Sequence, residues 1–139
     1  MTSRGIRNMN PANVRHSDKF TWKGEVYPTT NGEKEFCQFE DPKWGIRAMA
    51  RILGNYQKIH DRHTVFQMIH RWAPPTENDT AAYTEFVASE CALKTDSEIE
   101  FTEDPITAIK FMRAMITMEN GECPYTDEEL REGYDLAWG

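Results

Sequence analysis

Residues 104–121 read DPITAIKFMRAMITMENG, and this stretch carries the signals that begin, pack and end a helix. Asp104 can accept hydrogen bonds from free N–H groups of a first helical turn, and Pro105 suits the first helical position because no N–H is needed there. Apolar residues such as Ile109 and Met112 recur at helical spacing. Gly121 can adopt the left-handed conformation that ends many helices. The stretch predicts a helix from Pro105 to just before Gly121, with one buried face.

Glu119 falls in the last turn of this predicted helix, where the helix dipole disfavours negative charge. A partly buried carboxyl group at such a position is expected to keep its proton. Glycoside cleavage needs a protonated acid of this kind, because the departing sugar oxygen must receive a proton. The alternative interpretation is an exposed glutamate at a frayed helix end, with Asn120 and Gly121 as ordinary stop signals.

The rest of the chain carries further helix signals. Asp41 and Pro42 repeat the pair of cap and proline, and Thr126 with Glu129 matches a capping box. Hydrophobic periodicity and these caps predict helices over four further ranges: 42–58, 64–71, 79–91 and 126–137.

The first third of the chain has a different pattern. Residues 1–13 are polar and rich in asparagine, which indicates an irregular entry segment. Residues 13–39 look like a hairpin, because Asn31-Gly32 is typical of hairpin turns and apolar and polar side chains alternate after it, over residues 35–39. The sequence thus predicts one domain over residues 1–139 that is mainly α (α+β), with a small N-terminal β-hairpin.

Composition excludes several classes of protein. The chain has 139 residues, of which 39% are hydrophobic and 12% aromatic, so a folded globule is expected. A net charge of −7 argues against general nucleic-acid binding and against an anionic membrane surface. The apolar runs are too short to span a bilayer, and the start lacks an apolar leader. We therefore expect synthesis in the cytoplasm and no membrane insertion.

No metal or other cofactor is expected from the sequence. His60 and His63, with His70 further on, lack a carboxylate in register, and solvated histidines are the commoner explanation. Three cysteines without Cys-x-x-Cys spacing are expected to be isolated reduced thiols; they are Cys37, Cys91 and Cys123.

Residues 4–15, RGIRNMNPANVR, resemble the RGIRNNNPGNIR opening of a group of small phage proteins with structural or lysis-related roles. The resemblance covers nearly the whole chain. Met9 and Ala12 depart from the family pattern, and Ala12 lacks the tolerance of glycine for positive φ. The other segments that carry the resemblance are 22–24 (WKG), 36–39 (FCQF), 45–50 (GIRAMA), 71–78 (RWAPPTEN), Tyr83 and 119–121 (ENG).

A second similarity is to bacterial glucosaminidases and lytic transglycosylases with a lysozyme-like fold. In that family a helix ending in Glu-Ser-Gly precedes an asparagine-containing segment, a Trp-x-Gly hairpin and a tyrosine-bearing stretch. In this chain the segments 10–14, 22–24 and 72–83 follow in that order, and the glutamate helix comes last. The resemblance therefore implies a circularly permuted lysozyme-like domain, a change that is tolerable where termini lie close together.

The resemblance also implies a set of site residues. Glu119 takes the position of the general acid, which then acts as the base in a second step. Tyr83 and Asn78 are expected to line the sugar cleft. Asn10 and Asn13 are expected to orient N-acetyl or hydroxyl groups, because amides both donate and accept hydrogen bonds.

Two further residues have alternative roles. Trp72 is either a stacking platform for a sugar ring or a core tryptophan at the end of a helix. Glu35 is the candidate for a second acid, while ordinary solvated hairpin charges would explain Glu33, Glu35 and Glu40 equally. A single acid favours lytic transglycosylase chemistry, and a positioned second carboxylate favours hydrolysis.

The sequence therefore predicts a phage-type glycosidase that cleaves peptidoglycan, either an endolysin or a virion-associated enzyme. Its expected partners are peptidoglycan glycan strands and, in a virion, other virion proteins; it is expected to be a monomer that acts on the periplasmic cell wall. The alternative is a non-catalytic virion structural or glycan-binding protein with the same fold. The acidic charge keeps this alternative open, since anionic walls favour basic enzymes.

Overall fold

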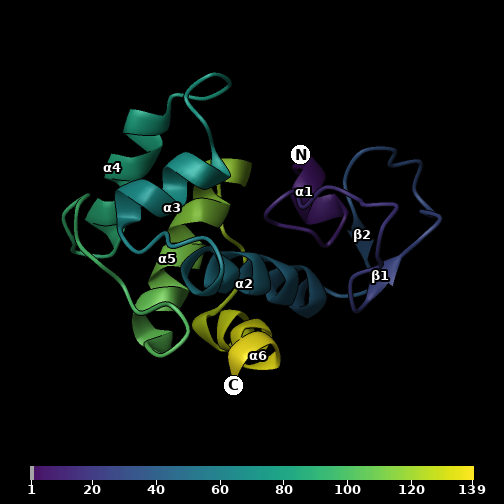
Figure 1. The fold of residues 1–139 in the computed structure, drawn as a ribbon. Coiled ribbons are helices and arrows are strands. Elements are labelled where there is room, and N and C mark those ends of the chain that lie inside the picture. The colour runs from purple at the N-terminus through teal and green to yellow at the C-terminus, as the bar shows by residue number, and fades with distance from the viewer. Residues whose placement is uncertain (1) are drawn as a thin grey trace.

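Helix α2 lies between two halves of the molecule in a computed structural model, which describes residues 2–139 (Figure 1). The N-terminal half, with α1 and a two-stranded hairpin, lies at one end of α2, and helices α3, α4 and α5 lie around the other. Over the described residues the fold is mainly helical with a small antiparallel hairpin, as predicted. The elements are α1 Arg4–Arg7, β1 Glu25–Val26, β2 Gln38–Phe39, α2 Pro42–Lys58, α3 Val65–Trp72, α4 Thr80–Glu90, α5 Pro105–Asn120 and α6 Asp127–Trp138.

The predicted caps begin the helices. Asp41 accepts a hydrogen bond from the Lys43 N–H at the start of α2, and Asp104 does the same for Thr107 in α5. Thr126 and Glu129 form a reciprocal capping box on α6. Gly121 ends α5 in a left-handed conformation (φ 79°), so Glu119 lies in the last turn as predicted. Local chemistry is thus enough to define these boundaries.

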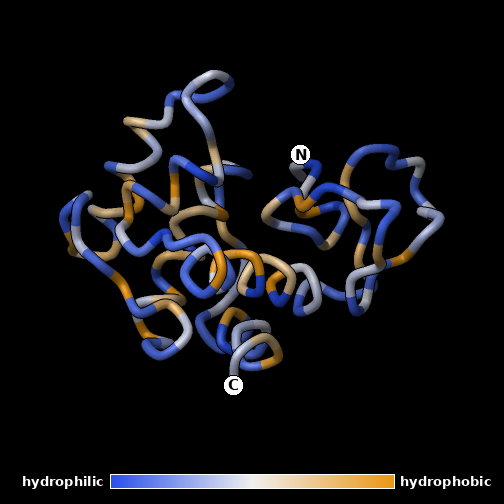
Figure 2. The backbone as a smooth tube through the Cα atoms, viewed as in Figure 1, coloured by the Kyte–Doolittle hydropathy of each residue, from blue (hydrophilic) through white to orange (hydrophobic). Residues whose placement is uncertain are grey.

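The core lies where α2 meets the other helices, and Figure 2 shows hydrophobic segments along α2 and hydrophilic residues over most outer loops. The largest fully buried side chains come mainly from α2, α3 and α5, among them Leu53, Met68 and Met112. Helix α6 packs along α2, where the Trp138 indole N–H donates to the Ala50 carbonyl at 2.7 Å. Among the described residues, no helix has the length and apolar content needed to cross a bilayer.

The N-terminal half differs from the expectation in two respects. Residues Arg4–Arg7 form a short helix, because Ser3 caps it by accepting the Ile6 N–H. The hairpin strands have two residues each, and Asn31-Gly32 lies in a long connection instead of a tight turn. This connection is organised by a side chain and not by a ladder of backbone hydrogen bonds.

That side chain is the carboxylate of Glu33, which is only 6% exposed. It accepts two hydrogen bonds from the Arg4 guanidinium at 2.7 Å and one from the Asn8 amide at 3.0 Å. Three successive backbone N–H groups, of residues 34–36, also donate to it. These donors, above all Arg4, hold the pKa of Glu33 far below its ordinary value.

The Glu33→Gln variant is expected to have a lower free energy of unfolding than the parent at neutral pH. That free energy should also fall less than the parent's when the pH is lowered. Because the folded-state pKa of Glu33 is depressed, its contribution is present above about pH 4.5 and is lost as the pH falls further. Urea denaturation at pH 7 and pH 3.5 measures this. Glu35→Gln is the matched control, because its side chain is 57% exposed and its bond to Arg15 is longer, at 3.3 Å. Equal effects of both variants would contradict the assignment.

Candidate active site

A cavity of about 580 Å³ lies between the N-terminal half and the helical half of the molecule. Its walls come from segments that are far apart in the chain, which explains why no single motif describes it. The lining residues are Ala12, Asn13, Val14, Arg15, Phe20, Trp22, Phe36, Ile52, Tyr56, Trp72, Ala73, Glu77, Asn78 and Glu119.

Glu119 enters this cavity from the last turn of α5 and is half-buried. Its Oε2 atom accepts a hydrogen bond from the Tyr83 hydroxyl at 3.0 Å and another from the Trp72 indole N–H at 3.4 Å. Oε1 accepts none from the residues that the structure describes. One oxygen is therefore held by the protein while the other can meet a ligand.

Tyr83 is 5% exposed and holds Glu119 from α4. Burial, followed by the nearby Glu119 carboxylate, raises the pKa of Tyr83 well above its ordinary value. The phenol is therefore a permanent donor at any physiological pH. Tyr83 is not part of the lining, which corrects the expectation that it lines the cleft; it acts on the cavity through Glu119.

Asn120 ties the N-terminal segment to the end of the Glu119 helix. Its amide donates to the Pro11 carbonyl at 2.7 Å and to the Ile116 carbonyl at 3.0 Å, and its oxygen accepts from the Ser3 hydroxyl at 2.6 Å. The sequence suggested only a stop signal for Asn120. Its hydrogen bonds to Ser3 and Pro11 join two segments that are far apart in the chain, and local sequence patterns do not predict such contacts.

The two asparagines of the N-terminal segment have different roles. Asn10 is fully buried, and its amide bonds the backbone of Val14 and the carbonyl of Cys37 at 2.9 Å. With its hydrogen bonds used in this way, Asn10 shapes the loop and does not contact a ligand, which corrects the expected substrate role. Asn13 does line the cavity. The positive φ values of this segment fall on Met9 (55°) and Asn13 (53°) and not on Ala12, so glycine is not required at Ala12.

Glu35, expected as a second acid, does not line the cavity. Its neighbour Phe36 does, and successive side chains of an extended segment point to opposite sides. Glu35 instead pairs with Arg15 at the surface. The second carboxylate of the cavity is Glu77, between α3 and α4. It was not predicted from the sequence, although it directly precedes the predicted Asn78.

Aromatic side chains form much of the cavity wall. Trp72 packs partly against the core, edge-on to Tyr56, and also lines the cavity. Asn78 lines the cavity as predicted and donates to the Pro74 carbonyl. The other aromatic lining residues were not predicted as site residues from the sequence; they are Phe20, Trp22, Phe36 and Tyr56.

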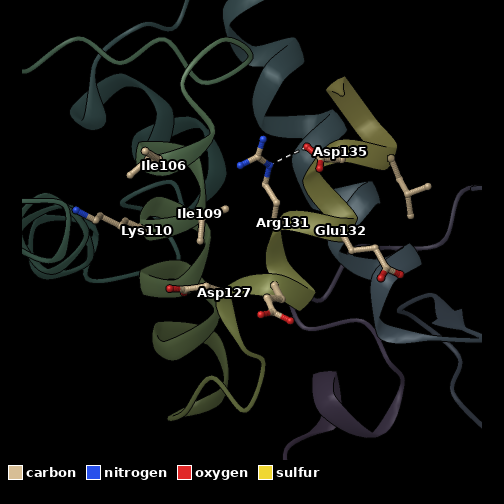
Figure 3. Close-up of a pocket in the computed structure, with 9 residues that line it drawn as sticks. Ile106, Ile109, Lys110, Asp127, Arg131, Glu132 and Asp135 are labelled. Atoms are coloured by element: carbon tan, nitrogen blue, oxygen red, sulfur yellow. Dashed lines mark hydrogen bonds and ion pairs between the residues drawn. The ribbon is translucent and has the colours of Figure 1, made fainter.

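A second hollow, of about 740 Å³, lies between α5 and α6 (Figure 3). Its walls include Ile106 and Ile109, and Arg131 beside it bonds Asp135 at 2.9 Å. These charges are surface pairs, and none of the predicted site residues lines this hollow. The cavity with Glu119 is therefore the candidate active site.

The fold and the site define a mainly helical domain with one half-buried glutamate in a cavity between its two halves. No family model matches the chain. It is 36% identical over 139 residues to Protein P5 of Pseudoalteromonas phage PM2, an alignment that covers 99% of this chain and 82% of that protein. The chain belongs to the family of this bacteriophage protein.

Proposed function

We propose that the protein cleaves the glycan strands of peptidoglycan, with Glu119 as the general acid and base. The observation that carries this proposal is the position of Glu119: half-buried in an aromatic-lined cavity, with one carboxyl oxygen held by Tyr83 and Trp72. Because Oε2 only accepts hydrogen bonds there, the proton for a departing sugar oxygen belongs on Oε1.

The same oxygen can serve in both steps of a lytic transglycosylase. Glu119 first protonates the glycosidic oxygen, and the bond to the departing sugar breaks. Its carboxylate then removes the proton from a hydroxyl group of the substrate itself, which closes an anhydro ring. Hydrolysis would instead need a water molecule and a second carboxylate. Glu77 is the candidate for that role, because it lines the same cavity.

The lysozyme-like arrangement is part of this proposal. Asn120 ties the N-terminal segment to the glutamate helix, so the order of segments in the chain can change while their arrangement in space is kept. This contact supports the circular permutation that the motif order implies. A role as an endolysin or a virion-associated enzyme would fit a family with a bacteriophage member.

A non-catalytic glycan-binding virion protein is the second candidate, favoured by the net charge of −7. Chromatography of purified peptidoglycan after incubation separates the two. An enzyme releases soluble muropeptides, whereas a binding protein sediments with the wall and leaves it intact. Sedimentation without release would overturn the enzymatic proposal.

Tyr83→Phe is expected to lower kcat about tenfold, because one hydrogen bond to the reacting carboxyl group is worth about 1–1.5 kcal/mol. KM should change little, since Tyr83 does not line the cavity. Initial rates of muropeptide release measure both constants. Tyr125→Phe is the matched control, because its buried hydroxyl has no hydrogen-bond partner among the described residues. Equal rates for both variants would contradict the role of Tyr83.

A further inference from the structure

Three potential metal ligands meet in the N-terminal half, on the other side of the hairpin from Glu119. They are His16, Glu25 and Cys37, and one ligand atom from each lies within 4.8 Å of the other two. The Glu25 side chain is 1% exposed, Cys37 is fully buried, and the His16 side chain is 17% exposed. Buried charged groups are normally paired or bind a metal, and Glu25 is buried here beside His16 and Cys37.

Backbone pairing brings these ligands together. The His16 N–H donates to the Glu35 carbonyl at 3.0 Å, and the Cys37 N–H donates to the Val14 carbonyl at 2.8 Å. Between them, Arg15 is paired with Phe36, and both of these side chains line the cavity of Glu119. Neither His16 nor Cys37 lines that cavity, and His16 lines a separate small cavity. Strand β1 places Glu25 there as well.

The surrounding contacts orient the ligands. His16 Nδ1 lies 2.6 Å from Glu25 Oε2, while Nε2 lies 3.3 Å from a carboxylate oxygen of Asp18. The His16 ring also stacks on Tyr27 at 3.9 Å between centroids. A carboxylate behind the second ring nitrogen is the usual support of a metal-binding histidine. The backbone N–H of Trp22 donates to the other carboxyl oxygen of Glu25, Oε1, at 3.0 Å.

Access to the cluster comes from a small cavity of about 320 Å³, which His16 and Glu25 line together with Asp18 and Tyr27. An ion can enter from this side, and a water molecule can supply a fourth ligand.

We propose that His16, Glu25 and Cys37 bind one Zn²⁺ ion that staples the N-terminal half together. One nitrogen, one sulfur and one oxygen donor suit zinc and exclude Ca²⁺ and Mg²⁺, which prefer oxygen alone. Binding replaces the hydrogen bond between His16 Nδ1 and Glu25 Oε2 by two metal bonds, and it releases two protons to the solvent: the one in that hydrogen bond and the thiol proton of Cys37. The histidine then donates from Nε2 to Asp18. Ligand atoms around tetrahedral zinc lie about 3.3 Å apart, so the two side chains separate slightly.

The structural reason for a staple is the shortness of the hairpin. Strands of two residues contribute few hydrogen bonds, and a metal joins three segments that the ladder leaves loosely connected. This site could not be predicted from the sequence, because the ligands are spread over residues 16–37 without motif spacing. This proposal does not depend on glycan cleavage.

Cobalt spectroscopy and native mass spectrometry of the full chain test the site. We expect one zinc ion per chain and, after exchange with Co²⁺, a thiolate-to-cobalt charge-transfer band. Cys37→Ser and His16→Asn should abolish both. His16→Asn is the milder variant, because an amide can still donate to Glu25 while its nitrogen does not ligate zinc. Cys91→Ser, at a buried thiol in the helical half, should leave both signals unchanged.

Thermal unfolding gives a second measurement. A chelator should lower the Tm of the wild-type chain by several degrees and leave that of His16→Asn unchanged. If Cys37→Ser fails to fold, His16→Asn alone decides the outcome. A wild-type chain that binds no stoichiometric zinc, or a cobalt band that persists in His16→Asn, would overturn the proposal.

Discussion

Glu119→Gln is expected to reduce the rate of cell-wall lysis by about 10²- to 10⁴-fold, the usual effect of removing a general acid and base. Glutamine keeps the shape of the side chain and can still accept the hydrogen bonds from Tyr83 and Trp72. It cannot transfer a proton to a departing sugar oxygen. The loss should therefore appear in kcat, and the fall in turbidity of outer-membrane-stripped cells measures it.

Glu122→Gln is the matched control for this experiment. It makes the same change in charge three residues further on, at an exposed position that does not line the cavity. We expect nearly unchanged lysis by this variant. The thermal unfolding midpoints of both variants should stay close to that of the parent. Equal lysis by Glu119→Gln and the parent protein would end the assignment of Glu119.

Gly45→Ala is expected to destabilise the fold by about 1–3 kcal/mol, the usual cost of overpacking. In an ordinary helix this substitution would stabilise the protein by up to about 1 kcal/mol, so the sign itself is informative. A Cβ atom at Gly45 would overlap the carbonyl oxygen of Met9 and press on Asn10 and Pro11 at 3.1 Å. The N-terminal segment therefore has to move away from α2.

Urea denaturation followed by tryptophan fluorescence measures this effect. Asn55→Ala, also in α2, is the control, because it raises helix propensity and its side chain makes no hydrogen bond among the described residues. Gly45→Ala should also slow lysis, since the displaced segment carries Asn13 into the cavity wall. A Gly45→Ala protein that is more stable than its parent would contradict the close packing of α2 against this segment.

The helices could be predicted from sequence because their signals are local. Asp41, Asp104 and Thr126 lie next to the N–H groups that they cap, so a short stretch contains the cause and its effect. Glu119 could be placed in a last helical turn for the same reason, with Gly121 two residues later. The helical part of the fold class followed from these signals.

The short strands and long connection of the hairpin, and much of the site, could not be predicted, because their causes lie far apart in the chain. The connection around Glu33 depends on Arg4, and the packing of the N-terminal segment depends on Asn120. An Asn-rich segment indicates polar contacts, but the pattern does not say which amide forms its hydrogen bonds within the loop. Asn10 bonds the loop backbone in this way, whereas Asn13 lines the cavity.

The second carboxylate shows the same limit. Glu35 and Glu77 are both acidic residues in connections, and only the arrangement of the two halves places Glu77 at the cavity. Alternation along the segment of Phe36 turns Glu35 away. A sequence pattern can therefore nominate acids, while tertiary structure selects between them.

A mass spectrum of the soluble products from purified peptidoglycan tests the central claim most directly. With the parent protein we predict disaccharide muropeptides. Their mass distinguishes lytic transglycosylation from hydrolysis, because anhydro products are lighter than hydrolysed ones by one water molecule. With Glu119→Gln we predict no release above background. Intact peptidoglycan after incubation with the folded parent protein, or the same products from Glu119→Gln, would contradict the claim that this glutamate cleaves glycan strands.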